Sequence, residues 1–125
     1  MPASLDSTRA AFNHYIVQEV KDDNVLLRIY ICESDKVDHK PLYLELIERA
    51  RQLGMSGSTV LRGLAGYGAA KVIHVEHSLK LSSDLPVVIE FVDTSERVKK
   101  FLATVGPLLG SGLVTEEKVV VHKYG

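Results

Sequence analysis

Hydrophobic side chains recur along this chain with two periods, one typical of strands and one typical of helices. In residues 25–32 every second side chain lies on one face, and that face carries Val25, Leu27, Ile29 and Ile31. The near-continuous hydrophobicity of this segment predicts a central strand. Three further segments have an extended pattern: residues 58–62, 84–92 and 119–121.

Two segments between these strands carry apolar residues at helical spacing. The first begins at Pro41, which suits a first helical turn, and ends at Gly54, which suits a left-handed cap. The second begins near Asp93, which has capping-box spacing to Glu96, and is disrupted or ended by residues 106–107. The expected buried stripes are Leu42, Leu46, Ile47, Ala50 and Leu53 in the first helix, and Val98, Phe101, Leu102 and Val105 in the second.

The order of these elements is strand, helix, strand, long connection, strand, helix, strand. Each half is a crossover unit with parallel strands, and two such units joined through antiparallel strands form a split βαβ fold. We therefore predict an α+β protein, a ferredoxin-like βαββαβ sandwich. It has an antiparallel four-stranded sheet with two helices on one face and a long loop between the second and third strands.

The second face of this sheet has no cover in the predicted fold. Its candidate residues are Leu26, Tyr30, Val60, Val88 and Val92. An exposed apolar patch of this kind on a small protein predicts association. We expect a homo-oligomer in which the sheets pack inward.

Residues 1–23 are interpreted as an N-terminal extension that precedes a domain of residues 24–125. A capping pattern at residues 4–7 slightly favours a helix with one apolar side. The alternative is a strand over residues 14–20 that turns at residues 21–24.

The connection between the second and third strands is far longer than a hairpin loop and opens with three glycines. Gly63, Gly66 and Gly68 are interpreted as a bulge and hinge, or as a hinge that also exposes amide groups to an anionic ligand. The neighbouring Arg62 suits a phosphate or, alternatively, an ion pair. After the second helix, residues 110–112 form either a plain turn or a backbone cradle for a ligand.

Composition excludes several classes of function. Of 125 residues 46% are hydrophobic, and the formal net charge is −1, which argues against a nucleic-acid-binding face. Cys32 is the one cysteine, so an internal disulfide is excluded, and a small buried residue is its simplest role. No apolar run reaches the length of a membrane span and no signal-peptide pattern is present, so we expect a cytoplasmic protein. No catalytic pairing can be justified from spacing, and we expect a protein that is not an enzyme.

Two groups of side chains raise the question of metal binding. His74, Glu76 and His77 are three possible ligands in a short span, although further ligands would be needed. A solvated polar loop is the simpler interpretation. The acidic residues of segment 33–38 suit a hard cation such as magnesium, but a solvated loop before a helix is again simpler.

Several spaced motifs, in the same order, resemble the PII superfamily of signalling proteins. They are residues 54–60 (GMSGSTV), 66–68 (GYG), 84–90 (DLPVVIE) and 110–112 (GSG). Three segments are most similar to a PII-like family named for a domain of unknown function, number 190: residues 27–35 (LRIYICESD), 59–68 (TVLRGLAGYG) and 112–117 (GLVTEE). The resemblance covers about residues 25–124.

The resemblance implies a non-enzymatic regulatory homotrimer. Such a trimer binds a small effector, most plausibly an adenine nucleotide, in clefts between subunits. A mobile loop, here about residues 69–83, would report the bound state to a partner, which by analogy is a membrane transporter or channel. The residues implied in effector binding are Thr59, Arg62, Gly63, Gly66, Gly68, Gly110, Gly112 and Lys123.

The chain also departs from the PII pattern at the phosphate side. Leu113 stands where PII proteins carry a basic residue, and residues 69–71 lack the glutamine that helps bind magnesium. These differences favour a less charged adenine ligand, or no nucleotide at all, over ATP with magnesium. The alternative function is a divalent-metal-binding trimer similar to CutA-type proteins, with His74, Glu76, His77 and Cys32 as ligands.

Overall fold

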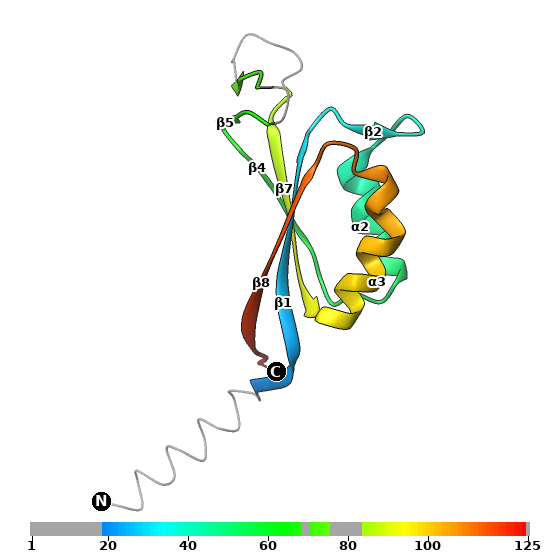
Figure 1. Cartoon of the computed structure of the whole chain (residues 1–125), viewed down its shortest axis with the longest axis vertical. Coiled ribbons are helices and arrows are strands. Elements are labelled where there is room, and N and C mark those ends of the chain that lie inside the picture. The colour runs from blue at the N-terminus through cyan, green and yellow to red at the C-terminus, as the bar shows by residue number, and fades with distance from the viewer. Residues whose placement is uncertain (1–18, 69–70, 76–83, 125) are drawn as a thin grey trace, which may run out of the picture.

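Four long strands form one antiparallel sheet, and two helices cover one of its faces (Figure 1). The computed structural model describes residues 19–68, 71–75 and 84–124. The sheet strands are β1 (Glu19–Cys32), β4 (Thr59–Arg62), β7 (Pro86–Thr94) and β8 (Leu113–His122), in the spatial order β4-β7-β1-β8. The helices are α2 (Leu42–Gln52) and α3 (Ser95–Val105). This arrangement confirms the predicted ferredoxin-like βαββαβ sandwich.

Short elements join these six. Strands β2 (Lys36–Val37) and β3 (Lys40–Pro41) pair before α2, and the 3-10 turn η1 (Gly106–Leu108) follows α3. Within the long connection, β5 (Ala65–Gly66) pairs with β6 (His74–Val75). The connection therefore folds back on itself above one end of the sheet, shown at the top of Figure 1.

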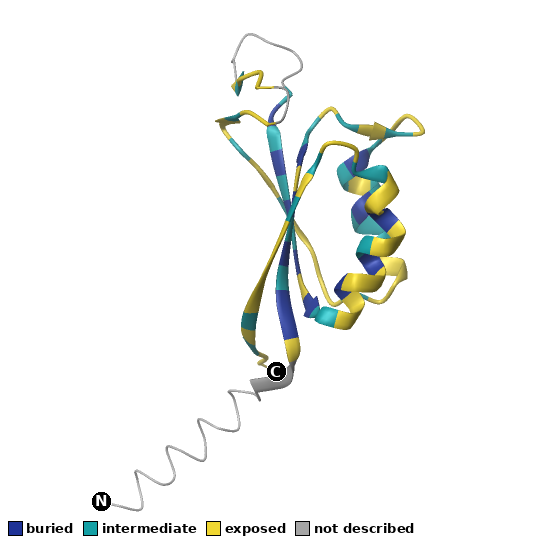
Figure 2. Cartoon of the chain, viewed as in Figure 1, coloured by how far each residue is buried: buried dark blue, intermediate teal, exposed yellow. Residues whose placement is uncertain are grey.

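The core lies between the sheet and the helices, where buried positions face one another (Figure 2). Alternate residues of β1 and β7 point into it, as the period-two pattern predicts. Phe91 of β7 and Phe101 of α3 pack with ring centroids 4.9 Å apart and an interplanar angle of 55°. Of the predicted helical stripes, Leu42, Leu46, Ala50, Val98, Phe101 and Val105 are buried, Ile47 and Leu102 are half-buried, and Leu53 is exposed.

The helix ends follow the sequence signals with one correction. Gly54 has φ of 77° just after α2, as expected for a left-handed cap, and α3 ends at Val105, immediately before residues 106–107. The expected Asp93–Glu96 capping box is wrong, because Thr94 is the N-cap and its hydroxyl accepts a hydrogen bond from the Arg97 amide (3.2 Å). The Asp93 carboxylate instead accepts hydrogen bonds from the amides of Ser56 and Thr94.

Strand β1 begins at Glu19, inside the segment interpreted as an N-terminal extension. Its pairing with β8 shifts register between Val20 and Asn24, where the sequence suggested a turn, so the strand continues through that segment with an irregularity. The helix or strand expected over residues 4–18 lies outside the described residues. The domain boundary at residue 24 remains a prediction.

The sheet face opposite the helices carries Leu26, Tyr30, Val88 and Val92, as expected. Val60 is a correction: it pairs with Ile89 and packs against the core. Leu61, which pairs with Val88 and is 50% exposed, takes its place on the open face.

Candidate functional site

The long connection between β4 and β7 begins at Gly63, in close contact with Pro86, the residue at which the chain re-enters the sheet. The Gly63 amide donates a hydrogen bond of 2.7 Å to the Pro86 carbonyl, and a Cβ at residue 63 would lie 2.9 Å from the Pro86 ring. A Cβ at Gly66 would lie 3.2 Å from the same ring. A Cβ at Gly68 would meet nothing within 4 Å. Close packing therefore explains glycine at residue 63, and leaves the glycine at 68 without a packing requirement.

Arg62 is engaged in an ion pair at this end of the sheet. Its guanidinium lies 2.5 Å from the carboxylate of Glu33, and the Arg62 side chain is 59% exposed. The sequence allowed two roles for Arg62, a phosphate contact or an ion pair. The structure supplies a partner for the ion pair, Glu33, within the chain. A phosphate would have to compete with Glu33 for this guanidinium.

The glycine turn before β8 packs against the end of β1. Gly110 has φ of 56°, in the left-handed region. A Cβ at Gly112 would lie 3.1 Å from the Leu109 carbonyl oxygen and 3.3 Å from both Ile31 and the Tyr30 carbonyl oxygen. Since Ile31 pairs with Val87, this turn lies at the same end of the sheet as the glycine-rich connection. The structure thus brings Arg62, Gly63, Gly66, Gly110 and Gly112 to one end.

Lys123 and Thr59 lie elsewhere. Lys123 follows β8 directly, next to the start of β1, because His122 pairs with Glu19. Ile31 lies twelve residues further along β1 than Glu19. At about 3.3 Å per strand residue, the two are roughly 40 Å apart. Thr59 begins the edge strand β4, on the open sheet face opposite Glu90. Lys123 therefore cannot line a site with the glycine turns of its own chain.

A hollow of about 990 Å³ lies at the Lys123 end. It is lined by the start of α3, the end of β7, the segment before β4 and the end of β8. Its residues are Asp23, Asn24, Ser56, Val92, Asp93, Thr94, Ser95, Glu96, Arg97, Lys99, Lys100, Val121 and Lys123. Five hydrogen-bonding or charged groups of the α3 start thus share one concave surface with the terminal lysine, a composition that suits an anionic ligand with polar groups.

Asp93 organises this hollow, although sequence reasoning assigned it only to a helix cap. Its carboxylate is 4% exposed and accepts hydrogen bonds from the Ser56 amide (2.9 Å) and the Thr94 amide (2.7 Å). Arg97 lies 3.6 Å away and also donates to the Gly54 carbonyl oxygen (3.2 Å). The segment before β4 is thereby fixed to the start of α3. The glycine-rich segment 54–58 was the sequence signal that could have located this wall.

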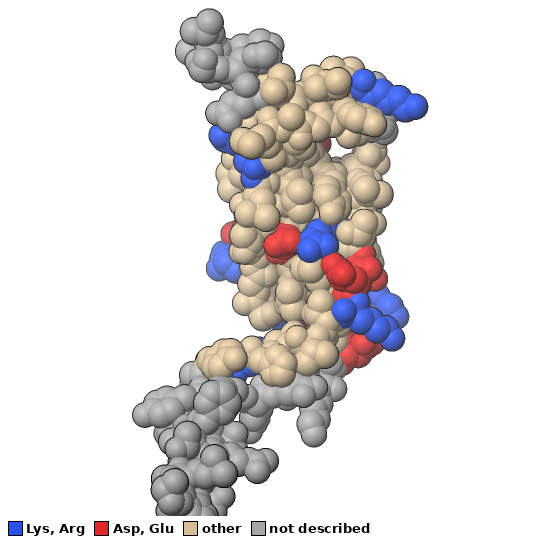
Figure 3. Space-filling view, turned by 90° about the vertical axis from the view of Figure 1, so that its left-hand side faces the viewer, with Lys and Arg blue, Asp and Glu red and all other residues tan. Residues whose placement is uncertain are grey.

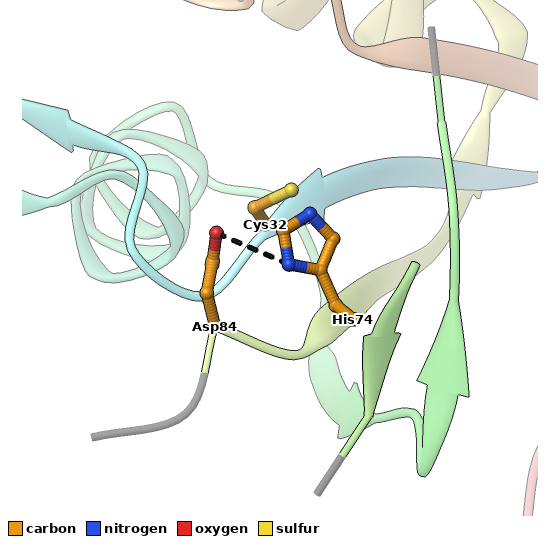
Figure 4. Close-up of side chains that lie close together, drawn as sticks. All are labelled: Cys32, His74 and Asp84. Carbon is orange, nitrogen blue, oxygen red and sulfur yellow. Dashed lines mark ion pairs between the residues drawn. The ribbon is translucent and has the colours of Figure 1, made fainter. Parts of the chain in front are cut away.

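A cluster of mixed donor atoms lies at the opposite, glycine-rich end. Cys32, His74 and Asp84 each place one donor atom within 4.8 Å of the other two (Figure 4). The Asp84 carboxylate is 3.7 Å from His74 Nδ1. The sequence alternative included Cys32 and His74 but not Asp84, and its other members, Glu76 and His77, lie outside the described residues.

Figure 3 shows acidic and basic side chains side by side near the centre of the open sheet face, with uncharged surface above and below them. Arg28 donates to Glu90 (2.9 Å) and to Glu117 (2.7 Å). The Glu90 hydrogen bond in particular raises the pKa of Arg28. Exposed or half-buried apolar residues surround this triad on all four strands: Leu26, Tyr30, Leu61, Val88, Val92 and Leu113.

Comparison with known proteins identifies the family. The sequence model of DUF190, described as "Uncharacterized ACR", matches residues 24–121. A UPF0166 protein of Aquifex aeolicus (strain VF5) is 43% identical over 96 residues, which cover 77% of this chain and 90% of that protein. A UPF0166 protein of Methanocaldococcus jannaschii is 32% identical over 99 residues, covering 78% and 91%. The chain therefore belongs to the DUF190 family, as the sequence motifs indicated.

Solved structures of PII-like proteins share the fold of this chain. CPII from Thiomonas intermedia K12, a nitrogen regulatory PII-like protein bound to ADP, AMP and bicarbonate, has a TM-score of 0.65 at 19% identity. The match covers 86% of this chain and 93% of CPII. The apo form of CPII has a TM-score of 0.53 at 20% identity, covering 80% and 92%. Among the described residues of this chain, no helix is long and apolar enough to cross a membrane.

Proposed function

We propose that this chain is a PII-like regulatory protein that binds an adenine nucleotide between copies of itself. It acts by binding and not by catalysis. The observation that carries the proposal is the separation of two surfaces on one sheet: a glycine-lined end, and a hollow with basic side chains. A nucleotide contacts both surfaces if one copy supplies the glycine turns and a neighbouring copy supplies the hollow and Lys123.

The open sheet face supports a homotrimer as the assembly. Apolar residues from four strands would be removed from water, and burying apolar surface contributes about 25 cal/mol per Å². The Arg28 triad would leave no unpaired charge in such an interface, since each of its charges already has a partner within the chain. In this assembly the walls of each cleft include Thr59, Arg62, Gly63, Gly66, Gly68, Gly110 and Gly112 from one copy.

The charges at the glycine end favour a nucleotide with few phosphates. Arg62 is already paired with Glu33, and Leu113, at the start of β8, is 60% exposed and offers no charge. Asp84 adds a further negative charge nearby. AMP and ADP are therefore better ligands than ATP with magnesium. This agrees with what the CPII structures contain, ADP and AMP.

The long connection is the segment that would transmit the ligand-bound state to a partner protein. It leaves the sheet at Arg62 and returns at Pro86, next to the nucleotide surface. A ligand shifts such a connection between states only if it binds one state more tightly. By analogy with the PII superfamily, the partner that reads this state is a membrane transporter or channel.

A thermal-shift panel tests the proposal. AMP, ADP, ATP with and without magnesium, cyclic AMP and GMP are added at millimolar concentration to the full chain. A ligand that binds the native state adds about 2.7 kcal/mol to the free energy of unfolding at 100 times its Kd, and this raises the melting temperature. AMP or ADP is expected to give the largest rise. No rise with any adenine nucleotide, or an equal rise with GMP, overturns the proposal.

A further inference from the structure

Three side chains meet where the long connection joins the sheet. Cys32 ends β1, His74 begins β6, and Asp84 precedes β7 by two residues (Figure 4). One donor atom of each lies within 4.8 Å of the other two. Ligand atoms around a tetrahedral Zn²⁺ lie roughly 3.3–3.7 Å apart, given bond lengths of about 2.0–2.3 Å. A closing movement of about 1 Å would therefore bring all three into bonding positions.

We propose that Cys32, His74 and Asp84 bind one divalent transition-metal ion of the Zn²⁺ class. Thiolate, imidazole and carboxylate are the protein ligands that Zn²⁺ takes, and a hard cation such as magnesium would not select the sulfur and nitrogen donors. Three protein ligands leave a fourth position for water. The site is independent of the proposed nucleotide cleft, so that either proposal can fail alone.

Hydrogen bonds already orient the carboxylate for this role. Asp84 Oδ1 accepts a hydrogen bond from the Ser34 amide (3.0 Å), while Oδ2 faces His74 Nδ1 at 3.7 Å. A ligand carboxylate that is held by an outer hydrogen bond is a recurrent feature of metal sites. The free oxygen is the one that points toward the imidazole.

The surroundings of the thiol are negative. The Asp35 carboxylate accepts a hydrogen bond from the Cys32 amide (2.9 Å), and a carboxylate oxygen of Asp84 lies within 4.8 Å of the Cys32 sulfur. Burial, followed by the charges of Asp84 and Asp35, raises the pKa of Cys32. A bound cation would offset the charges of these two carboxylates, and its binding would release the thiol proton to solvent.

A nucleophilic Cys-His-Asp arrangement explains the cluster less well. A nucleophilic thiol needs a lowered pKa, whereas the pKa of Cys32 is raised. A simple His74–Asp84 ion pair, in turn, gives no role to the sulfur.

Metal binding would join the middle of the connection to its return end and to the end of strand β1. His74 belongs to the β5–β6 pair, Cys32 to the central strand, and Asp84 to the return segment. Coordination therefore holds the β5–β6 pair against the end of the sheet. A metal ion is thereby a second effector of the same connection.

Titration with Co²⁺ under reducing conditions tests the site in the full chain. Tetrahedral cobalt with a thiolate ligand gives a charge-transfer band in the near ultraviolet, and this band reports Cys32 because the chain has one cysteine. We expect the band to appear on titration and to disappear when Zn²⁺ is added. Cobalt binding without the band, or no binding, overturns the proposal.

Variants separate this site from other histidines. His74→Gln and Asp84→Asn are each expected to weaken Co²⁺ binding more than about tenfold, since even outer-shell partners are worth 10–100-fold. His74 lies on a short strand outside the core, and asparagine keeps an acceptor for the Ser34 amide, so both variants should fold. His122→Gln, on exposed β8, is the matched control. Unchanged affinity in both cluster variants overturns the assignment.

Discussion

Arg28 and Glu90 lie directly opposite each other on neighbouring strands, with Arg28 Nε 2.9 Å from the Glu90 carboxylate. Glu117, on the other neighbour of β1, accepts a second hydrogen bond from the same guanidinium. This one cation therefore links three strands in the middle of the face that the helices leave open. Opposite charges across strands contribute to pairing, while like charges without a cation between them oppose it.

Replacing Arg28 with alanine is expected to weaken the association of copies. The change leaves Glu90 and Glu117 without their shared cation on the proposed interface, where burial makes unpaired charges costly. Light scattering coupled to size exclusion is expected to give the mass of three chains for the parent and a lower mass for the variant. Arg51→Ala is the control, because Arg51 also pairs with a glutamate but lies on α2. Identical masses for parent and Arg28→Ala at every concentration would contradict the interface.

Replacing Lys123 with alanine is expected to weaken nucleotide binding about tenfold, or about 1.4 kcal/mol. Lys123 lines the hollow, and its loss removes a positive charge from the phosphate side of the proposed cleft. Calorimetric titration with AMP measures the change. Lys118→Ala is the matched control, since Lys118 is exposed on β8, the strand that Lys123 follows, and is not among the residues that line the hollow. Equal losses in the two variants would mean that only net charge matters.

The sequence predicted the elements whose signal is local and periodic. The alternation of Val25, Leu27, Ile29 and Ile31 located the core face of β1, and Gly54 located the end of α2, because both patterns depend only on near neighbours. It was harder to predict which side of β4 faces the core. Val60 and Leu61 are both apolar, so periodicity alone could not decide which of them faces the core.

The site residues that were missed depend on contacts between distant segments. Asp93 bonds the Ser56 amide across 37 residues, whereas its local spacing to Glu96 favoured a cap. Asp84 meets Cys32 because β1 and β7 pair, and spacing along the chain carries no signal of that contact. Most candidate binding residues came from the family motifs. The fold places Arg62 and the glycines at one end of the sheet and Lys123 at the other.

Replacing Gly63 with alanine is expected to lower the free energy of unfolding by about 1–3 kcal/mol. The added Cβ would lie 2.9 Å from the Pro86 ring, and moving apart would stretch the 2.7 Å hydrogen bond between these residues. Gly68→Ala lies on the same connection with open space around its Cβ and should stay within about 0.5 kcal/mol of the parent. Urea denaturation compares the two variants. A Gly68→Ala loss as large as that of Gly63→Ala would refute the packing argument.

The raised pKa of Cys32 predicts slow alkylation at neutral pH in the absence of metal. Burial, then Asp84 and Asp35, favours the protonated thiol, so the rate with iodoacetamide should reach half its maximum above the usual thiol range. Asp84→Asn removes one of the two charges and should move this midpoint to lower pH. Folding raises this pKa, so the stability that the thiol contributes is present below the unfolded pKa and is lost as pH rises through the folded value. A midpoint at or below the unfolded value would show that burial and the two carboxylates do not raise the pKa of Cys32.

The most direct test of the central claim is a calorimetric titration of AMP into the full chain, with the mass of the same sample measured by light scattering. The account predicts saturable binding of one AMP per chain in an assembly of three chains. A protein that stays a single chain, or that binds no AMP or ADP at millimolar concentration, would contradict it.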